Sequence, residues 1–255
     1  MKIINKKHTS FLIIGLLFIL FGCCKNSNTT NEQTIESIVN ESLEFSLQQS
    51  LKMAVSLKDK NSLLPKTTDR FGNLETCNSS WWVSGFFPGT LWYLYENSNS
   101  EEVKNWAIDY TLRVKDQQFT TDNHDVGFMI FCSFGNAYRL TKDKAYLEVI
   151  LNASNSLSTR FNTTTKTIKS WDSGGPNNNW QYPVIIDNMM NLELLFWASR
   201  ETGDQTFHDI AITHADNTIK NHFRSDYSSY HVICYDENGK VLVKKQHQGY
   251  QDEST

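Results

Sequence analysis

The sequence predicts an all-α protein built from helical hairpins in series, as in an α/α toroid or a solenoid. Apolar residues recur with helical spacing through most of the chain. An aromatic-rich apolar helix is repeatedly followed by a short polar turn and an amphipathic helix. Two of these turns are alike, since TKDKAY at 141–146 parallels TGDQTF at 202–207. Such hairpins bury their apolar faces against their neighbours in the series.

The first helix is predicted to begin at Ile35, because apolar residues return about every four positions as far as Val55, and Thr34 is a suitable N-cap. Only 230–235 and 240–243 alternate like strands, and they predict one small β-hairpin. A closed ring would need more helical pairs than the sequence supplies. The remaining predicted helices form three pairs: 86–95 with 103–114, 128–140 with 146–157, and 188–199 with 207–214.

Residues 1–22 have the form of an export signal, with three lysines, an apolar run and then a cysteine. The segment before Cys23 resembles a bacterial lipobox, so acylation is expected at Cys23, with Cys24 as the alternative. The polar stretch 23–34 is predicted to be a flexible tether, and 35–255 to be one partial domain. The expected location is therefore exported, periplasmic or at the outer membrane, with only a lipid anchor in the membrane.

Charge and cysteine content exclude several function classes. Removing 1–22 takes away three of the 24 basic residues, which leaves 21 against 28 acidic ones. This net charge of −7 does not favour nucleic acid. The sparse, odd set Cys77, Cys132 and Cys234 predicts neither a disulfide framework nor a structural zinc site. Nothing in the sequence indicates an oligomeric state.

Two carboxylates are candidates for catalysis, because Asp125 and Asp187 each stand just before an apolar helix. The simpler alternative is that each is an ordinary N-cap, a position that Asp favours. Their neighbours support a site, since His124 is beside one and Asn188 beside the other. A helix N-terminus also favours a nearby negative charge.

Tryptophans in the neighbouring loops point to sugar binding, because an indole ring stacks on the apolar face of a pyranose. Trp82 and Trp171 are the candidates, whereas Trp92, Trp106 and Trp197 lie on helical stripes and are predicted to be core. His231 and Gln248 fit a binding role and an ordinary polar role equally well.

Three motifs carry a resemblance to a known family: WVSGFFPGTLW at 82–92, HDVGF at 124–128 and IDNMMN at 186–191. Together, and in this order, they resemble the unsaturated glucuronyl hydrolases, glycoside hydrolase family 88. The likeness runs from the helix at Ile35 to Thr255. It implies an (α/α)6 barrel that needs no metal or organic cofactor. It also implies hydrolysis of lyase-generated oligosaccharides, of glycosaminoglycan type, that carry a Δ4,5-unsaturated uronic acid at the non-reducing end.

The resemblance also implies roles for the candidate residues. Asp187 would be the general acid and base that hydrates the vinyl ether of the unsaturated sugar, and Asp125 would assist it. Binding residues by motif position would be His124, Trp82, Trp171, His231 and Gln248. The family's Trp-x-Arg-Gly-Gln-x-Trp stretch is not in this sequence, so the resemblance implies a domain truncated at its C-terminus. The preference for sulfated or unsulfated sugars stays open.

Two other functions remain compatible with the sequence. An inverting glycosidase could divide the acid and base roles between Asp125 and Asp187 across a wider gap. A lipid-anchored protein with an incomplete barrel could bind sugar without catalysis.

Overall fold

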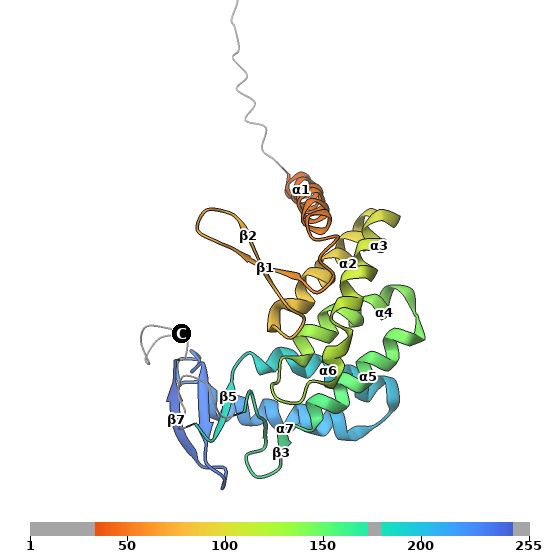
Figure 1. Ribbon diagram of the computed structural model, residues 1–255. Helices are drawn as coiled ribbons and strands as arrows, with labels where there is room; N and C mark the ends of the chain where they lie inside the picture. Colours follow the sequence, from red (N-terminus) through yellow and green to blue (C-terminus); the bar gives the residue numbers. More distant parts are fainter. Residues whose placement is uncertain (1–33, 173–179, 247–255) are drawn as a thin grey trace, which may run out of the picture.

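The computed structural model describes residues 34–172 and 180–246, and its helices form an arc (Figure 1). Helix α1 lies at one end of the arc and a small sheet at the other. The helical elements are α1 (Ile35–Ser56), α2 (Phe86–Ser98), α3 (Glu101–Arg113), η3 (Gly127–Gly135), α4 (Asn136–Thr141), α5 (Lys144–Ser158), α6 (Asn188–Thr202) and α7 (Gln205–His222), with short 3₁₀ turns η1 (Trp82–Gly85) and η2 (Lys115–Phe119). This arrangement confirms the three predicted hairpins, in which α2 pairs with α3, η3 and α4 with α5, and α6 with α7.

The three hairpins share one turn design, which confirms the internal repeat. Each first helix ends at a residue with positive φ, and the next residue caps the second helix. Asn99, Lys142 and Gly203 have φ of 54°, 60° and 77°. The caps that follow accept a hydrogen bond from a backbone N–H of the next helix, and they are Ser100, Asp143 and Asp204. The repeat is therefore encoded by local turn chemistry.

The main core lies where the apolar faces of these hairpins meet. Trp92 is fully buried, and its indole N–H donates to Thr111 Oγ1 at 2.9 Å. Trp106 and Trp197 are partly buried against the same core. All three tryptophans that the sequence assigned to the core are confirmed there. Helix α1 is attached less firmly, since only Ser50 and Ala54 are buried in it and most of its apolar stripe is exposed.

The prediction of a single β-hairpin was incomplete, because residues 34–172 and 180–246 contain three small antiparallel sheets. The predicted hairpin is present as β6 and β7, but β5 extends it to three strands. The other pairs are β1 with β2 and β3 with β4. These strands are too short for an alternating pattern to stand out in the sequence. Their bounds are β1 (Leu64–Thr68), β2 (Leu74–Cys77), β3 (Phe161–Asn162), β4 (Thr167–Ile168), β5 (Tyr182–Ile185), β6 (Val232–Tyr235) and β7 (Val241–Lys245).

The helix predicted from Phe128 exists, but its first part, η3, is a π-helix over nine residues. π-Helical segments are rare and often occur at functional sites. Within the ranges 34–172 and 180–246, no helix is long and apolar enough to cross a membrane. The predictions for the export signal, for Cys23 and for Gln248 concern residues outside the described ranges, and so does most of the predicted tether.

Candidate active site

The site forms where the loop before η3 meets the segment before β5. An isolated β-bridge joins Asn123 to Trp171. Beside it, the backbone N–H of His124 donates to Ser170 O at 2.9 Å. The N–H of Ser170 in turn donates to Pro183 O in β5, at 2.9 Å. These bonds bring the loop of Asp125 and the strand that leads to Asp187 to one place, although 62 positions separate the two carboxylates in the sequence.

His124 lies between the two carboxylates. Its ring is 2% exposed, and its Nε2 atom is 3.2 Å from Asp125 Oδ1 and 3.6 Å from Asp187 Oδ1. The other ring nitrogen, Nδ1, is 3.2 Å from Ser170 Oγ. Both carboxylates therefore face one imidazole edge. The distance between Asp125 Oδ1 and Asp187 Oδ1 therefore cannot exceed the sum of their two distances from Nε2.

Neither carboxylate acts as a helix cap. Asp187 occupies the position before α6, but its side chain makes no capping hydrogen bond there. Asp125 precedes the helical residue Val126 and accepts the N–H of Met129 through its backbone oxygen at 3.0 Å, but among the described residues its carboxylate accepts no helix N–H. The ordinary interpretation of the two residues as N-caps is therefore wrong for this chain. Asp143 and Asp204 show the contrast, because their carboxylates accept N–H bonds at 2.9 and 2.8 Å.

The surroundings of Asp187 favour its protonated form. Its side chain is 41% exposed, but its Oδ1 atom is buried and has no hydrogen-bond partner among the described residues. Burial raises the pKa of this carboxyl above its ordinary value, the electrostatic interaction with His124 opposes the rise, and the negative charge of Asp125 adds to it. A carboxyl with a raised pKa is suited to donate a proton near neutral pH.

An aromatic cluster adjoins the histidine. Phe128 packs edge-on against His124, with ring centroids 6.4 Å apart, and also contacts Phe86 and Trp82. Trp82 contacts Phe86 as well and remains 42% exposed. The structure therefore brings Trp82 to the site with an open indole surface.

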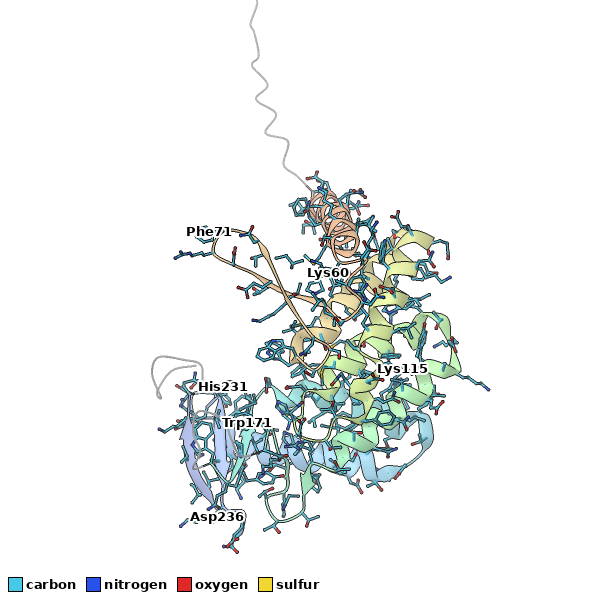
Figure 2. All side chains as sticks on the ribbon, viewed as in Figure 1. Lys60, Phe71, Lys115, Trp171, His231 and Asp236 are labelled. Carbon is cyan, nitrogen blue, oxygen red and sulfur yellow. The ribbon has the colours of Figure 1, made fainter. Side chains whose placement is uncertain are left out.

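Trp171 and His231 lie at the three-stranded sheet (Figure 2). Trp171 is partly buried and packs against Trp180, with ring centroids 6.2 Å apart, so Trp180 belongs to a small core. His231 O accepts the N–H of Ile186, the residue before Asp187, at 2.9 Å. Backbone contacts thus place Trp171 near the loop of Asp125 and His231 near the residue before Asp187. Gln248 lies beyond the described range.

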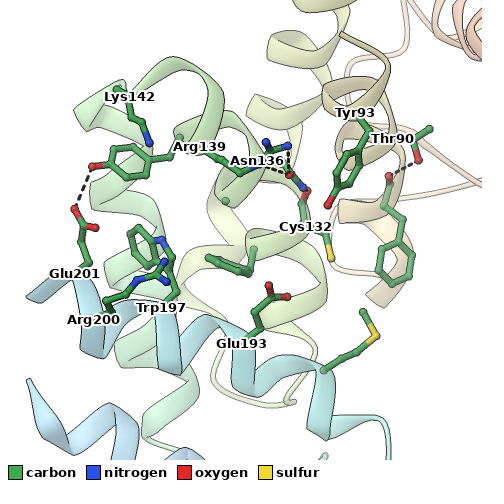
Figure 3. Close-up of a pocket in the computed structure, with 16 residues that line it drawn as sticks. Thr90, Tyr93, Cys132, Asn136, Arg139, Lys142, Glu193, Trp197, Arg200 and Glu201 are labelled. Carbon is green, nitrogen blue, oxygen red and sulfur yellow. Dashed lines mark hydrogen bonds between the residues drawn. The ribbon is translucent and has the colours of Figure 1, made fainter. Parts of the chain in front are cut away.

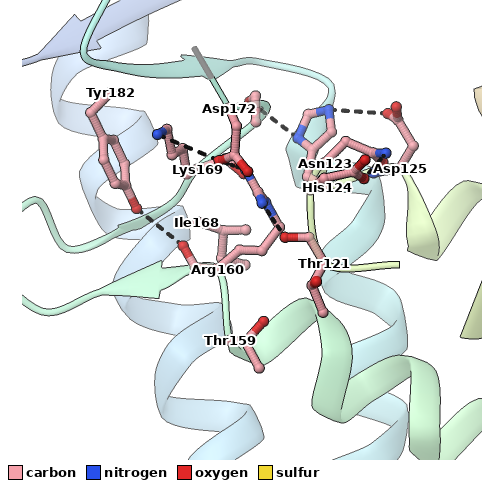
Figure 4. A network of polar contacts seen from close by, with 12 residues as sticks. Thr121, Asn123, His124, Asp125, Thr159, Arg160, Ile168, Lys169, Asp172 and Tyr182 are labelled. Atoms are coloured by element: carbon pink, nitrogen blue, oxygen red, sulfur yellow. Dashed lines mark hydrogen bonds and ion pairs between the residues drawn. The ribbon is translucent and has the colours of Figure 1, made fainter. Parts of the chain in front are cut away.

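Arg160 fastens the loops of the site (Figure 4). Its guanidinium is buried and donates to Lys169 O at 2.8 Å, to Asp172 Oδ1 at 3.2 Å and to Thr121 O. Lys169 and Thr121 belong to the two segments that meet at His124. Arg160 could not be predicted as a site residue, because an arginine after a helix carries no sequence pattern that marks it as one.

A cavity of about 630 Å³ is lined by residues of α2, η3, α4 and α6 (Figure 3). Among the lining residues, Phe86 and Met190 are close in sequence to the site residues Trp82 and Asp187. Neither Asp125 nor Asp187 lines the cavity. Cys132 also lines it, and burial, with a smaller contribution from Glu193, raises the pKa of that thiol to about 11. No cluster of three His, Cys, Asp or Glu side chains suited to a metal ion occurs in the described part of the chain.

Comparison with known proteins identifies relatives of this chain. No family model matches the chain. The unsaturated glucuronyl hydrolase of Formosa agariphila is 38% identical over 251 residues, which are 96% of this chain and 60% of that protein. The unsaturated chondroitin disaccharide hydrolase of Streptococcus agalactiae is 30% identical over 85% of this chain and 54% of its own length. A crystal structure of an unsaturated glucuronyl hydrolase specific for heparin is 43% identical, with a TM-score of 0.76 over 84% of this chain and 57% of that one.

The chain belongs to the unsaturated glucuronyl hydrolase family. The structural match also confirms the helical toroid fold that the sequence predicted. The chain spans 54–60% of the length of these curated relatives.

The raised pKa of Asp187 predicts how the stability of this family member depends on pH. The folded state holds the Asp187 proton more tightly than the unfolded state, so the free energy of unfolding falls as pH rises from the ordinary aspartate pKa to the raised value. Above that window the cost of the buried charge is fully present, and below it the cost is absent. We therefore expect Asp187→Asn to raise Tm at pH 7.5 and to leave it almost unchanged at pH 3.5, as measured by thermal unfolding.

Asp204→Asn is the matched control, because the pKa of Asp204 is lowered by its hydrogen bonds with Thr206. Losing that charge removes a stabilising interaction, so this variant should not gain stability at pH 7.5. An equal change in Tm for Asp187→Asn at both pH values would contradict the prediction.

Arg160→Met is expected to lower the free energy of unfolding by about 2–4 kcal/mol, because three acceptors lose a charged donor. Urea denaturation measures this change. Arg139→Met is the control, since Arg139 binds Glu96 through two bonds at an exposed surface and should cost about 0–1 kcal/mol. Similar losses in the two variants would show that Arg160 does not fasten the loops.

Proposed function

We propose that the protein removes a Δ4,5-unsaturated uronic acid from the non-reducing end of oligosaccharides derived from glycosaminoglycans. The observation that carries the proposal is the convergence of Asp125 and Asp187 on Nε2 of His124, beside an exposed tryptophan. The names of the relatives support the substrate class, because they include hydrolases of unsaturated chondroitin disaccharides and one specific for heparin.

In the proposed reaction Asp187 serves as both acid and base. Its protonated carboxyl gives a proton to C4 of the unsaturated sugar, and the resulting carboxylate then takes a proton from the water that adds at C5. The hemiketal formed at C5 opens and expels the aglycone, and Asp187 ends protonated as it began. The raised pKa of Asp187 supports its role as the initial acid.

Asp125 would set the charge around the acid in this reaction. The negative charge of Asp125 makes ionisation of Asp187 less favourable, which favours the protonated form of Asp187. We assign Trp82 to stacking on the sugar, because its indole is open to solvent while its edge is held by Phe86 and Phe128. Trp171 is assigned to the same binding site because it forms a β-bridge with Asn123, the residue before His124. His231 is assigned to it because its backbone oxygen accepts the N–H of Ile186, the residue before Asp187.

The carboxylate spacing favours this reaction over an inverting mechanism. Inverting glycosidases hold their two carboxyl groups about 6.5–9.5 Å apart to admit a water between them. Here the Oδ1 atoms lie 3.2 and 3.6 Å from a single nitrogen, so their separation cannot exceed the two distances together, which is close to the short end of that range. Two carboxyl groups this close suit a mechanism in which Asp187 is the single acid and the negative charge of Asp125 stabilises its proton.

The test is to incubate the purified chain with unsaturated chondroitin and heparin disaccharides and to follow the ultraviolet absorbance of the conjugated double bond. We expect the absorbance to disappear. Release of reducing sugar from the matched saturated disaccharide, with no loss of absorbance from the unsaturated one, would instead identify an inverting glycosidase. A rise in Tm with ligand but no turnover would identify a sugar-binding protein.

A further inference from the structure

Ser170 is the buried hydroxyl that links the two halves of the site. It is fully buried, and its Oγ accepts the backbone N–H of Ile185 at 2.8 Å. Ile185 lies two residues before Asp187, so this bond anchors the strand that leads to the proposed acid. The same Oγ is 3.2 Å from Nδ1 of His124. The sequence analysis did not single out Ser170, because a serine in a polar segment has no distinguishing pattern.

The hydroxyl proton of Ser170 needs an acceptor, because a buried donor without a partner costs about 1–3 kcal/mol. Among the described residues, Ser170 Oγ contacts the Ile185 N–H and His124 Nδ1. The N–H is itself a donor and cannot accept. The hydroxyl therefore donates to Nδ1, which must then carry a lone pair, and the proton of the neutral imidazole resides on Nε2.

This tautomer suits the carboxylates. Both carboxylates lie on the Nε2 side of the ring, with Asp125 Oδ1 and Asp187 Oδ1 at 3.2 and 3.6 Å from that nitrogen. The opposite tautomer would direct the Nε2 lone pair at both carboxylates and would leave Ser170 without an acceptor. The hydrogen bond that one ring nitrogen makes commonly sets the protonation of the other.

We propose that Ser170 is a positioning residue, which fixes the imidazole proton of His124 on Nε2, the nitrogen that faces the carboxylate pair, and holds the ring in place. The backbone of Ser170 contributes to the same end, since its carbonyl accepts the N–H of His124 at 2.9 Å. Ser170 thus sets both the position and the tautomer of the histidine. Only the kinetic consequence of this inference rests on the proposed function.

The tautomer is measured directly by long-range ¹H–¹⁵N correlation spectra of the ¹⁵N-labelled chain, with the His124 signals assigned by their loss in His124→Gln. In the wild type we expect a protonated Nε2 and a bare Nδ1. Ser170→Ala should mix the tautomers, and Ser170→Thr, which keeps the hydroxyl, should restore the wild-type pattern. Ser154→Ala is the matched control, because Ser154 is as buried but donates only to Ile150 O within α5.

A wild-type spectrum with the proton on Nδ1 would overturn the proposal, even if the Ser170 variants failed to fold. An unchanged tautomer in folded Ser170→Ala would overturn it as well. If the chain turns over unsaturated disaccharide, we also expect Ser170→Ala to lower kcat by about 10- to 100-fold, as for outer partners that orient a histidine. If the tautomer is as expected but no turnover occurs, the proposed function fails and the assignment of Ser170 stands.

Discussion

Asp187→Asn is expected to lower kcat/KM for an unsaturated disaccharide by about 10³- to 10⁴-fold. A single positioned acid or base typically contributes about 10²- to 10⁴-fold, and Asp187 would perform both proton transfers of the proposed reaction. The amide has nearly the same shape as the carboxyl but can neither give a proton to C4 nor take one from water. The loss should appear in kcat with little change in KM, because substrate contacts remain.

The same substitution separates catalysis from helix capping. Asn caps helices about as well as Asp, so a residue that served only as a cap would tolerate the change. Asp204→Asn provides that case, because Asp204 caps α7 through a bond to Thr206 N at 2.8 Å. It should keep nearly full activity. Turnover of Asp187→Asn within about tenfold of wild type would rule out Asp187 as the acid and base.

The helices and their turns could be predicted from the sequence because their signals are local. Apolar spacing marks the hairpins, and the repeated turns contain the residues that cap each second helix, as at Asp143 and Asp204. The π-helical form of η3 could not be predicted, because its apolar residues fit an α-helix equally well. The strand β5 was missed because its four residues pair with β6, almost 50 positions later.

The site was predictable only in part, for a similar reason. Motifs identified Asp125, Asp187 and His124, but the convergence of both carboxylates on one nitrogen depends on contacts between segments far apart in sequence. Ser170 and Arg160 act through long-range hydrogen bonds of their side chains, and no local pattern predicts such bonds. The burial that raises the pKa of Asp187 is likewise a property of the assembled fold.

The second large effect is expected for Gly127→Ala, which should lower the free energy of unfolding by about 3–5 kcal/mol. A Cβ at Gly127 would lie 2.3 Å from Asn191 Oδ1 and 2.8 Å from Asn191 Cα, so η3 and α6 would have to separate. Overpacking of this kind costs about 1–3 kcal/mol. The shift would also break the bond from Phe128 N–H to Asn191 Oδ1, which is 3.0 Å long and buried, at a further cost of about 1–3 kcal/mol.

Activity should fall with stability in this variant, because η3 follows Asp125 and α6 follows Asp187. A misplacement of about 1 Å between reacting groups can cost about 10²-fold in rate. Gly72→Ala is the control for stability. Gly72 has φ of +84° in an open turn, so an added Cβ meets no neighbour and should cost about 1–2 kcal/mol of backbone strain. Urea denaturation of both variants measures the difference.

A double-mutant cycle identifies the contact responsible. Asn191→Ala removes the Oδ1 atom that a Cβ at position 127 would meet first, and it removes the bond to Phe128 N–H as well. If the contact between η3 and α6 is the cause, Gly127→Ala should cost less in the Asn191→Ala background, by about 1–3 kcal/mol. If the losses in free energy of unfolding from the two substitutions are strictly additive, the cost of Gly127→Ala does not arise from its contact with Asn191.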